Sequence, residues 1–198
     1  GGLLGNIGNI LREIGRYNEA VDHLNQALVI ANEKGDERGR GIWLGNLGLV
    51  YDDLNHPTQA AEYHAKSVEI ARKLYDQRGL AARLGNLGNS YVSAGDYQPA
   101  LTYFNEAINL FREMGDPGEL ALRLGIVGNI HAELGRTADD NQSAAGHFSA
   151  ALQHYAETLD IARSLGDHAT EAELLRSIGH VLANATRFDD AIGYLQAA

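Results

Sequence analysis

Apolar residues recur along the chain at spacings of three and four, with polar residues between them. Leu84, Leu87 and Tyr91 form one such stripe, and a second stripe runs from Ala100 to Phe111. Because successive residues of an α-helix are rotated by about 100°, residues at these spacings share one helix face. No segment shows sustained alternation of apolar and polar residues, so we expect an all-α protein without a sheet.

Short stop and start signals separate the expected helices. Gly115 suits the left-handed position that follows a helix, and Asp116, Pro117 and Glu119 are typical of the cap, first and third positions of the next helix. The signal predicts a helix end and a new helix at this point. It recurs at Gly35-Asp36 and Gly166-Asp167, and in varied form at Asn55 and Tyr75-Asp76.

A six-residue segment of the type Leu-Gly-Asn-Leu-Gly-Asn begins at Leu4, Leu44, Leu84 and Leu124, that is, every 40 residues. A weaker fifth copy begins at Leu175, so the fourth unit contains an insertion, which we place near 136–145 as a polar surface loop. Each unit contains two helices that bury their apolar faces by stacking on neighbouring units. We predict one domain over 1–198, part of a longer protein, with repeats at about 1–36, 37–76, 77–116, 117–167 and 168–198.

The repeated pattern resembles the tetratricopeptide repeat family. The third unit carries the residues of the family signature: Leu84, Leu87-Gly88, Tyr91, Ala100, Phe104 and Ala107. The resemblance implies a right-handed α-solenoid of stacked antiparallel helix pairs, with five repeats. The repeat length of 40 departs from the usual 34 and is similar to that of Pins-type adaptors, kinesin light chains and bacterial signalling proteins.

The resemblance also implies a concave groove that holds a peptide or protein segment. Polar residues recur on the helix face that would line it: Asn6, Asn9, Asn46, Asn86, Asn89 and Asn129, with Arg176 and His180 in the last unit. A carboxamide offers both a donor and an acceptor to a peptide backbone. Two interpretations stay open, because these asparagines could bind a ligand or could hydrogen-bond to neighbouring helices.

Glycines occupy a second recurring position beside the asparagines: Gly5, Gly45, Gly85 and Gly125. Glycine inside a helix costs about 1 kcal/mol relative to alanine. It either clears the groove floor for a ligand or allows tight helix packing, and the sequence leaves both open. The second glycine of each motif, such as Gly88, is expected to be a structural helix contact.

Charge restricts the partner. The net charge of −10 disfavours nucleic acid. Glu13, Asp52, Asp53 and Glu133 are expected to face the groove, against Arg12 and Arg176. The cationic clamp of chaperone-binding relatives is missing, so we expect a neutral or basic segment as the partner. No apolar stretch is long enough to cross a membrane.

No catalytic or metal-binding arrangement can be proposed from the sequence. There is no cysteine, no phosphate-binding loop and no pair of histidines four residues apart on a helix. His64, His131 and Trp43 are expected to serve packing. We therefore predict a cytoplasmic, non-catalytic protein-interaction scaffold without cofactors. The alternative is a regulatory or sensor arm of a larger bacterial signalling protein, with end-to-end self-association through the end at Ala198.

Overall fold

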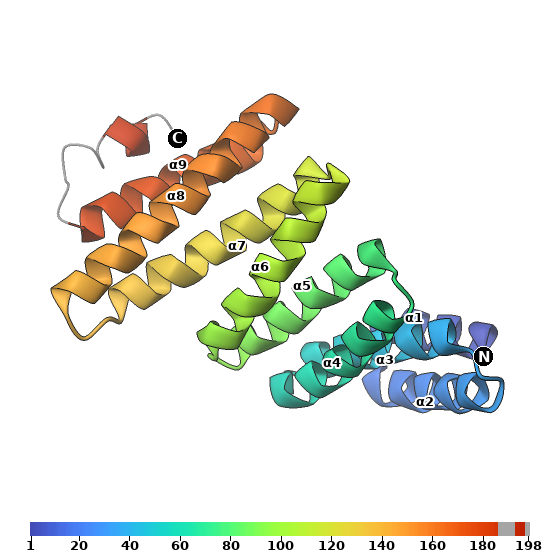
Figure 1. The fold of residues 1–198 in the computed structure, drawn as a ribbon. Coiled ribbons are helices and arrows are strands. Elements are labelled where there is room, and N and C mark those ends of the chain that lie inside the picture. Colours follow the sequence, from blue (N-terminus) through green and yellow to red (C-terminus); the bar gives the residue numbers. More distant parts are fainter. Residues whose placement is uncertain (186–192, 197–198) are drawn as a thin grey trace. The chain divides into compact units, whose positions relative to one another are not determined.

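The computed structural model describes residues 1–185 and 193–196, which form α-helices joined by short turns (Figure 1). No strand occurs within these ranges, and none of their helices combines the length and low polarity that a bilayer-spanning helix needs. In chain order the helices are α1 (Gly2–Glu13), α2 (Tyr17–Glu33), α3 (Glu37–Asp53), α4 (Pro57–Lys73), α5 (Gln77–Ser93), α6 (Tyr97–Met114), α7 (Pro117–Arg136), α8 (Asn141–Leu165) and α9 (His168–Asn184).

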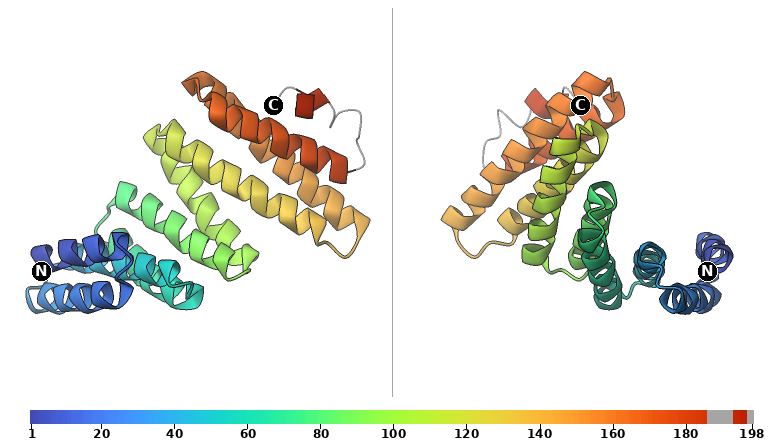
Figure 2. Two further views of the ribbon diagram at one scale, coloured as in Figure 1. Left: turned by 180° about the vertical axis from the view of Figure 1, so that it is seen from behind. Right: turned by 45° about the vertical axis from the view of Figure 1, so that its right-hand side comes forward.

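Two compact units make up the chain, Gly1–Leu110 and Phe111–Ala198, and their boundary falls within α6. In the first unit each helix from α1 to α4 contacts the next one along the chain, and α3 also contacts α1 and α5. In the second unit α8 packs against α7 and α9, and α7 also contacts α9 (Figures 1 and 2). Consecutive helix pairs therefore stack within each unit, as predicted. The single domain over 1–198 with its five repeats stays a prediction, and the expected association through Ala198 concerns a residue outside the described ranges.

The repeat junctions are capped in one recurring way. At each junction an aspartate accepts a hydrogen bond from the backbone N–H three residues later, which stabilises the first turn of the next helix. These bonds measure 2.8 to 3.3 Å and are made by Asp36, Asp76, Asp116 and Asp167. The residues before these caps are left-handed, as expected for Gly35, Gly115 and Gly166. Asn55 and Tyr75 adopt the same conformation without being glycine.

Contact between the two helices of a pair depends on glycine. A Cβ atom at the second glycine of the repeated motif would lie 2.5 to 2.8 Å from a side chain of the following helix, closer than real Cβ contacts. The facing pairs are Gly8 with Leu24, Gly48 with His64, Gly88 with Phe104, and Gly128 with Tyr155. The predicted structural role of these glycines is confirmed.

The insertion in the fourth repeat is helical, so the predicted loop over 136–145 is wrong in its extent. Helix α7 runs to Arg136 and α8 begins at Asn141, which leaves only 137–140 between them. Gly135 occupies the position that the turn glycines hold in other repeats, yet it lies inside α7. A Cβ there would lie 2.7 Å from the ring of Phe148, so the lengthened helices continue to pack against each other.

Tyr75 offers a test of the junction geometry. Its φ is +53° and its side chain is 91% exposed, so its ring is largely free of packing contacts. A non-glycine residue in this conformation is destabilised by about 1–2 kcal/mol. We expect Tyr75→Gly to raise the free energy of unfolding by about 1 kcal/mol in urea titrations. Asn55→Gly is the control and should gain less, because asparagine tolerates this conformation. Equal gains at both positions would contradict the explanation.

Candidate functional site

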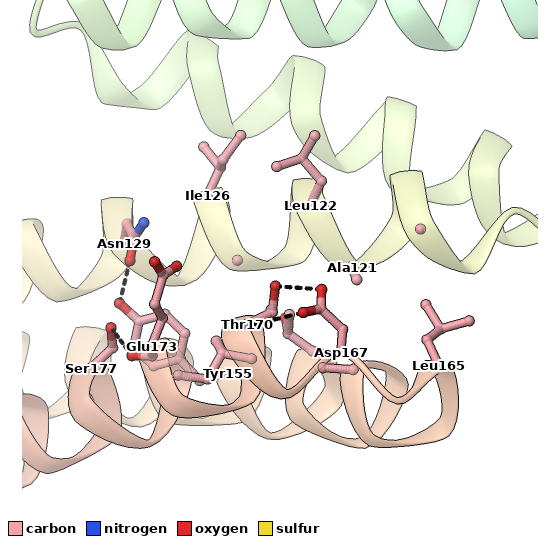
Figure 3. A pocket seen from close by; sticks show the side chains of 15 residues that line it. Ala121, Leu122, Ile126, Asn129, Tyr155, Leu165, Asp167, Thr170, Glu173 and Ser177 are labelled. Atoms are coloured by element: carbon pink, nitrogen blue, oxygen red, sulfur yellow. Dashed lines mark hydrogen bonds between the residues drawn. The ribbon is translucent and has the colours of Figure 1, made fainter. Parts of the chain in front are cut away.

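A pocket of about 400 Å³ lies between α7 and α9 in the second unit (Figure 3). Its base is formed by Tyr155, Thr158 and Ala162 of α8, each only 2% exposed. Pockets of this volume are within the range that binds small ligands or single side chains. One face of α7 forms the first wall, at the helical spacing 118, 121, 122, 125, 126 and 129. Helix α9 supplies the second wall.

Small residues on α7 keep this pocket open. Gly118 and Gly125 have no side chain, and Ala121 has only a methyl group. A Cβ added at Gly125 would have one neighbour within 4 Å, the Cγ2 atom of Thr158 at 3.9 Å. Gly125 therefore faces open space, which distinguishes it from the glycines that hold the helix pairs together.

The equivalent space in the first unit is filled. A Cβ at Gly5 would overlap the indole ring of Trp43, which is 8% exposed and belongs to the core of that unit. At Gly45 the neighbour is the hydroxyl of Ser67, which accepts a hydrogen bond from Nε of Arg83 at 2.7 Å.

In the fifth repeat, Leu174 occupies the position that Trp43 and Arg83 occupy in the second and third repeats. Leucine is too small to fill the space over Gly125, so the pocket remains. Gly5 therefore serves tight packing, whereas Gly125 lines an open pocket, and a ligand above Gly125 stays a prediction.

Asn129 is the one asparagine of the predicted binding row that lines this pocket. Its Oδ1 atom accepts a hydrogen bond of 2.6 Å from the hydroxyl of Tyr155. Burial raises the pKa of Tyr155 to about 12, so this hydroxyl stays protonated and remains the donor. The bond orients the carboxamide and leaves its Nδ2 group as a donor toward the pocket (Figure 3).

The charged groups of the pocket are both acidic. Asp167 accepts hydrogen bonds from the hydroxyl of Thr170 at 2.6 Å and from its backbone N–H at 3.0 Å. These bonds hold the pKa of Asp167 below its ordinary value, so the carboxylate stays ionised. Glu173 points into the pocket near Asn129 (Figure 3). No lysine, arginine or histidine is among the residues that line this pocket.

The remaining asparagines of the predicted row lie in the first unit. Asn6, Asn46 and Asn86 occupy the same register on α1, α3 and α5, helices that contact one another in succession. Asn6 is exposed and the other two are half-buried; Asn9 is also half-buried, and Asn89 is exposed. Within the described part of the chain, none of these five side chains has a hydrogen-bond partner. The interpretation that they bond to neighbouring helices therefore applies only to Asn129.

The last two predicted residues, Arg176 and His180, are exposed on α9 and do not line the pocket. Ser177, between them, does line it. The structure thus brings Asn129 and Ser177 together in one pocket and leaves Arg176 and His180 on the surface of the same helix.

Asp52 was expected in the groove, but its carboxylate bonds to the core of the first unit. Nε2 of His64 donates to one oxygen at 3.0 Å, and the Ser90 hydroxyl donates to the other at 2.8 Å. His64 is fully buried, as expected. A catalytic serine requires a hydrogen bond to the histidine that removes its proton. Here the carboxylate lies between the two and accepts from both, and Nδ1 of His64 is buried without a hydrogen-bond partner in the described residues.

Three histidines gather at the far end of α7 and α8, which the sequence spacing did not predict. Nδ1 of His131 lies 3.1 Å from Nδ1 of His147, and the ring of His131 stacks on that of His154 at 5.8 Å. His147 and His154 are seven residues apart, two turns on one helix face, which is the signal that could have revealed the cluster. Over the described residues, no three histidine or carboxylate groups are arranged to hold a metal ion.

Comparison with protein families and sequences gives two matches of different extent. The tetratricopeptide repeat model matches residues 2–73 and 57–113, more than half of the chain. The model of anaphase-promoting complex subunit 5 matches only residues 141–185, which is α8 and α9. No curated protein sequence matches the chain.

Solved structures share the fold of stacked helix pairs. The crystal structure of BtubC (BKLC) from P. vanneervenii has a TM-score of 0.81 at 18% identity, covering 98% of this chain and 76% of that one. The apo form of RapI has a TM-score of 0.84 at 16% identity, covering 98% and 67%. A STAND protein with a tetratricopeptide repeat sensor, from Pyrococcus horikoshii, has a TM-score of 0.78 at 13% identity, covering 100% and 30%. At these identities the likeness shows the fold alone, a right-handed α-solenoid.

The glycine row gives a matched pair of substitutions. Gly5→Ala should lower the free energy of unfolding by about 1–3 kcal/mol, because its methyl group would overlap Trp43. Gly125→Ala should raise it by about 1 kcal/mol, because the space is open and alanine favours the helix. Both are measured by urea unfolding. A change of the same sign at both positions would show that the two glycines do not differ as described.

The histidine cluster predicts a loss of stability at mildly acidic pH. Burial lowers the pKa of His131 and His154, and neighbouring histidines lower that of His131 further. The unfolded chain, with ordinary histidine pKa values near 6.5, therefore binds more protons just below that pH. The free energy of unfolding should therefore keep its full value above about pH 6.5. It should fall as the pH drops from 6.5 toward the lowered pKa values of these histidines in the folded chain.

Urea unfolding at pH 7.5 and 5.5 measures this loss. Both pH values lie above the range in which most carboxylates titrate. The double variant His131→Gln, His154→Gln should reduce the difference between the two pH values. His56→Gln, at an exposed position, is the control and should leave it unchanged. An unchanged pH dependence in the double variant would rule out the cluster as its source.

Proposed function

Because the chain belongs to the tetratricopeptide repeat family, we propose that it is a non-catalytic scaffold that binds a segment of another protein along the first helices of its repeats. The observation that carries this proposal is the set of asparagines on α1, α3 and α5. They share a register on helices that touch in succession, and their side chains have no partner in the described part of the chain.

Carboxamides without partners, arranged in a row, are suited to hydrogen bonding with a peptide backbone. Each can donate to a carbonyl and accept from an N–H, whatever side chains the peptide carries. Asparagine is also a weak helix former, so one asparagine in each of α1, α3 and α5 lowers the stability of these helices slightly. Half-burial of Asn46 and Asn86 restricts their rotamers before binding, which reduces the entropy lost on contact with a peptide.

The charge around this face supports a neutral or basic segment. The carboxylate of Asp53 is 42% exposed and lies 3.7 Å from Nε of Arg12, a separation that gives only a weak surface ion pair. Glu13 is exposed at the end of α1. With the net charge of −10, an acidic partner would be repelled over the whole surface.

A second candidate function is a sensor arm within a larger signalling protein. It is favoured by the likeness to the STAND protein, of which the matched part is a fraction and whose repeats are described as a sensor. A neighbouring ATPase or DNA-binding domain in the full-length gene would support it, and a short stand-alone reading frame would contradict it. End-to-end self-association belongs to this candidate, and a monomer at all concentrations in light scattering would count against it.

The asparagine row is tested with peptides selected from a random 12-residue phage library on the unmodified chain. The triple variant Asn46→Ala, Asn86→Ala, Asn89→Ala should bind the selected peptides roughly tenfold to a thousandfold more weakly, since each of three lost hydrogen bonds contributes about 0.5–1.5 kcal/mol. Circular dichroism should show helicity that is kept or increased, because alanine favours helices.

A matched control carries the same three changes at exposed asparagines of the second helices, Asn25, Asn105 and Asn109. It should bind as the unmodified chain does. Equal affinity of the two triple variants would remove the asparagine row from the binding surface.

A further inference from the structure

We infer that the pocket between α7 and α9 receives a lysine or arginine side chain of the bound segment, with its aliphatic stem on the apolar wall and its cation at the carboxylate of Glu173. This inference rests on the proposed function, because it names the side chain that the scaffold selects.

Charge is the first argument. Asp167 and Glu173 are the charged residues that line the pocket, and both are acidic. Asp167 already accepts two hydrogen bonds from Thr170. The Glu173 carboxylate has no hydrogen bond or ion pair with any other residue in the described ranges. A pocket with one committed and one uncommitted carboxylate, and with no cation in its lining, is complementary to a positive charge.

The neighbourhood of Glu173 shows that this is a local property of the pocket. Glu171, two residues earlier on α9, is paired with Nε of Arg163 at 2.7 Å, and its side chain is 23% exposed. Arginine is therefore available to glutamates of this helix, yet the glutamate that points into the pocket stays unpaired (Figure 3). An unpaired carboxylate beside apolar groups is destabilising when a ligand displaces its water, unless the ligand brings a cation.

Apolar surface is the second argument. Leu122 and Leu165 line the pocket and are 52% and 53% exposed, and Ile126 lies between Leu122 and Asn129 on the same helix face. The stems of lysine and arginine bury methylene groups on such surface while the charged end stays at the polar rim. A wholly apolar side chain would leave Glu173 without a partner, and an acidic side chain would be repelled.

Asn129 is the third argument, because it connects this pocket to the backbone of the bound segment. Tyr155 holds its Oδ1 atom, so only its Nδ2 group remains to donate. A peptide carbonyl is the acceptor that a segment lying along α7 would present there. The same residue would then contribute its carbonyl to Asn129 and its side chain to Glu173.

The direct test uses two small probes that share the backbone and a four-carbon side chain, Nα-acetyl-lysine N-methylamide and Nα-acetyl-norleucine N-methylamide, of which only the lysine probe also carries an ammonium group. Each is titrated at millimolar concentration into the ¹⁵N-labelled whole chain. The lysine probe should shift the backbone amide signals of Gly125, Asn129 and Ser177, and should bind about three- to fivefold more tightly than the norleucine probe, the range expected of an exposed ion pair. Added salt should reduce this preference.

Glu173→Gln should abolish the preference for lysine, and Glu171→Gln is its control. The control makes the same change in net charge on the same helix but removes a carboxylate outside the pocket lining. It should keep the preference. Leu174→Trp, which places at the pocket the residue that covers Gly5 in the first unit, should abolish the shifts of both probes.

Two results would overturn the inference: equal binding of the two probes, or an equal loss of preference in Glu173→Gln and Glu171→Gln. Failure of the proposed function would be seen in other experiments: the library selection would give no binding peptides, or the asparagine variants of the first unit would bind as the unmodified chain does. Peptides that bind through those asparagines without enrichment of lysine or arginine would retain the scaffold and reject the pocket.

Discussion

Helix pairs in this chain close over glycine. In four repeats a glycine of the first helix touches a large side chain of the second, at a separation that leaves no room for a Cβ. This contact sets how near the two helices come, and the chemistry of the residue above the glycine then determines what else the repeat must supply. Leu24 and Phe104 need only apolar neighbours, but His64 and Tyr155 bring polar atoms into the interior, where an unpaired group is destabilising.

Polar atoms above the glycines connect the core to the surface. Nε2 of His64 is bonded to Asp52, which also accepts from Ser90 of the next first helix, so a residue expected in the groove binds a core histidine instead. Nδ1 of His64 stays buried without a hydrogen-bond partner in the described residues. Tyr155 is satisfied by Asn129, and this bond fixes the orientation of an exposed carboxamide. The pocket between α7 and α9 is therefore positioned by the same contact that holds its helix pair together, and it needs no mobile loop to be formed.

Local signals in the sequence predicted the features that depend on neighbours along the chain. The aspartate caps, the left-handed Asn55 and the paired helices all follow from residues within one or two turns. The missed features depend on contacts between helices. His131 meets His147 only because the insertion lengthens α7 and α8, and the inward turn of Asp52 depends on Ser90, 38 residues later. Periodicity places a residue on a helix face, but it does not identify the side chain that the neighbouring helix presents there.

The glycine row illustrates the same limit most directly. Gly5 and Gly125 are identical in residue type and register, and each lowers helix stability by about 1 kcal/mol relative to alanine. At Gly5 the loss is offset by burial of the Trp43 ring, which alanine would prevent. At Gly125 no side chain of the described residues takes that place, because Leu174 is too small. Within the described structure Gly125 therefore lowers helix stability without a compensating contact, and the side chain that we propose for this pocket would supply one.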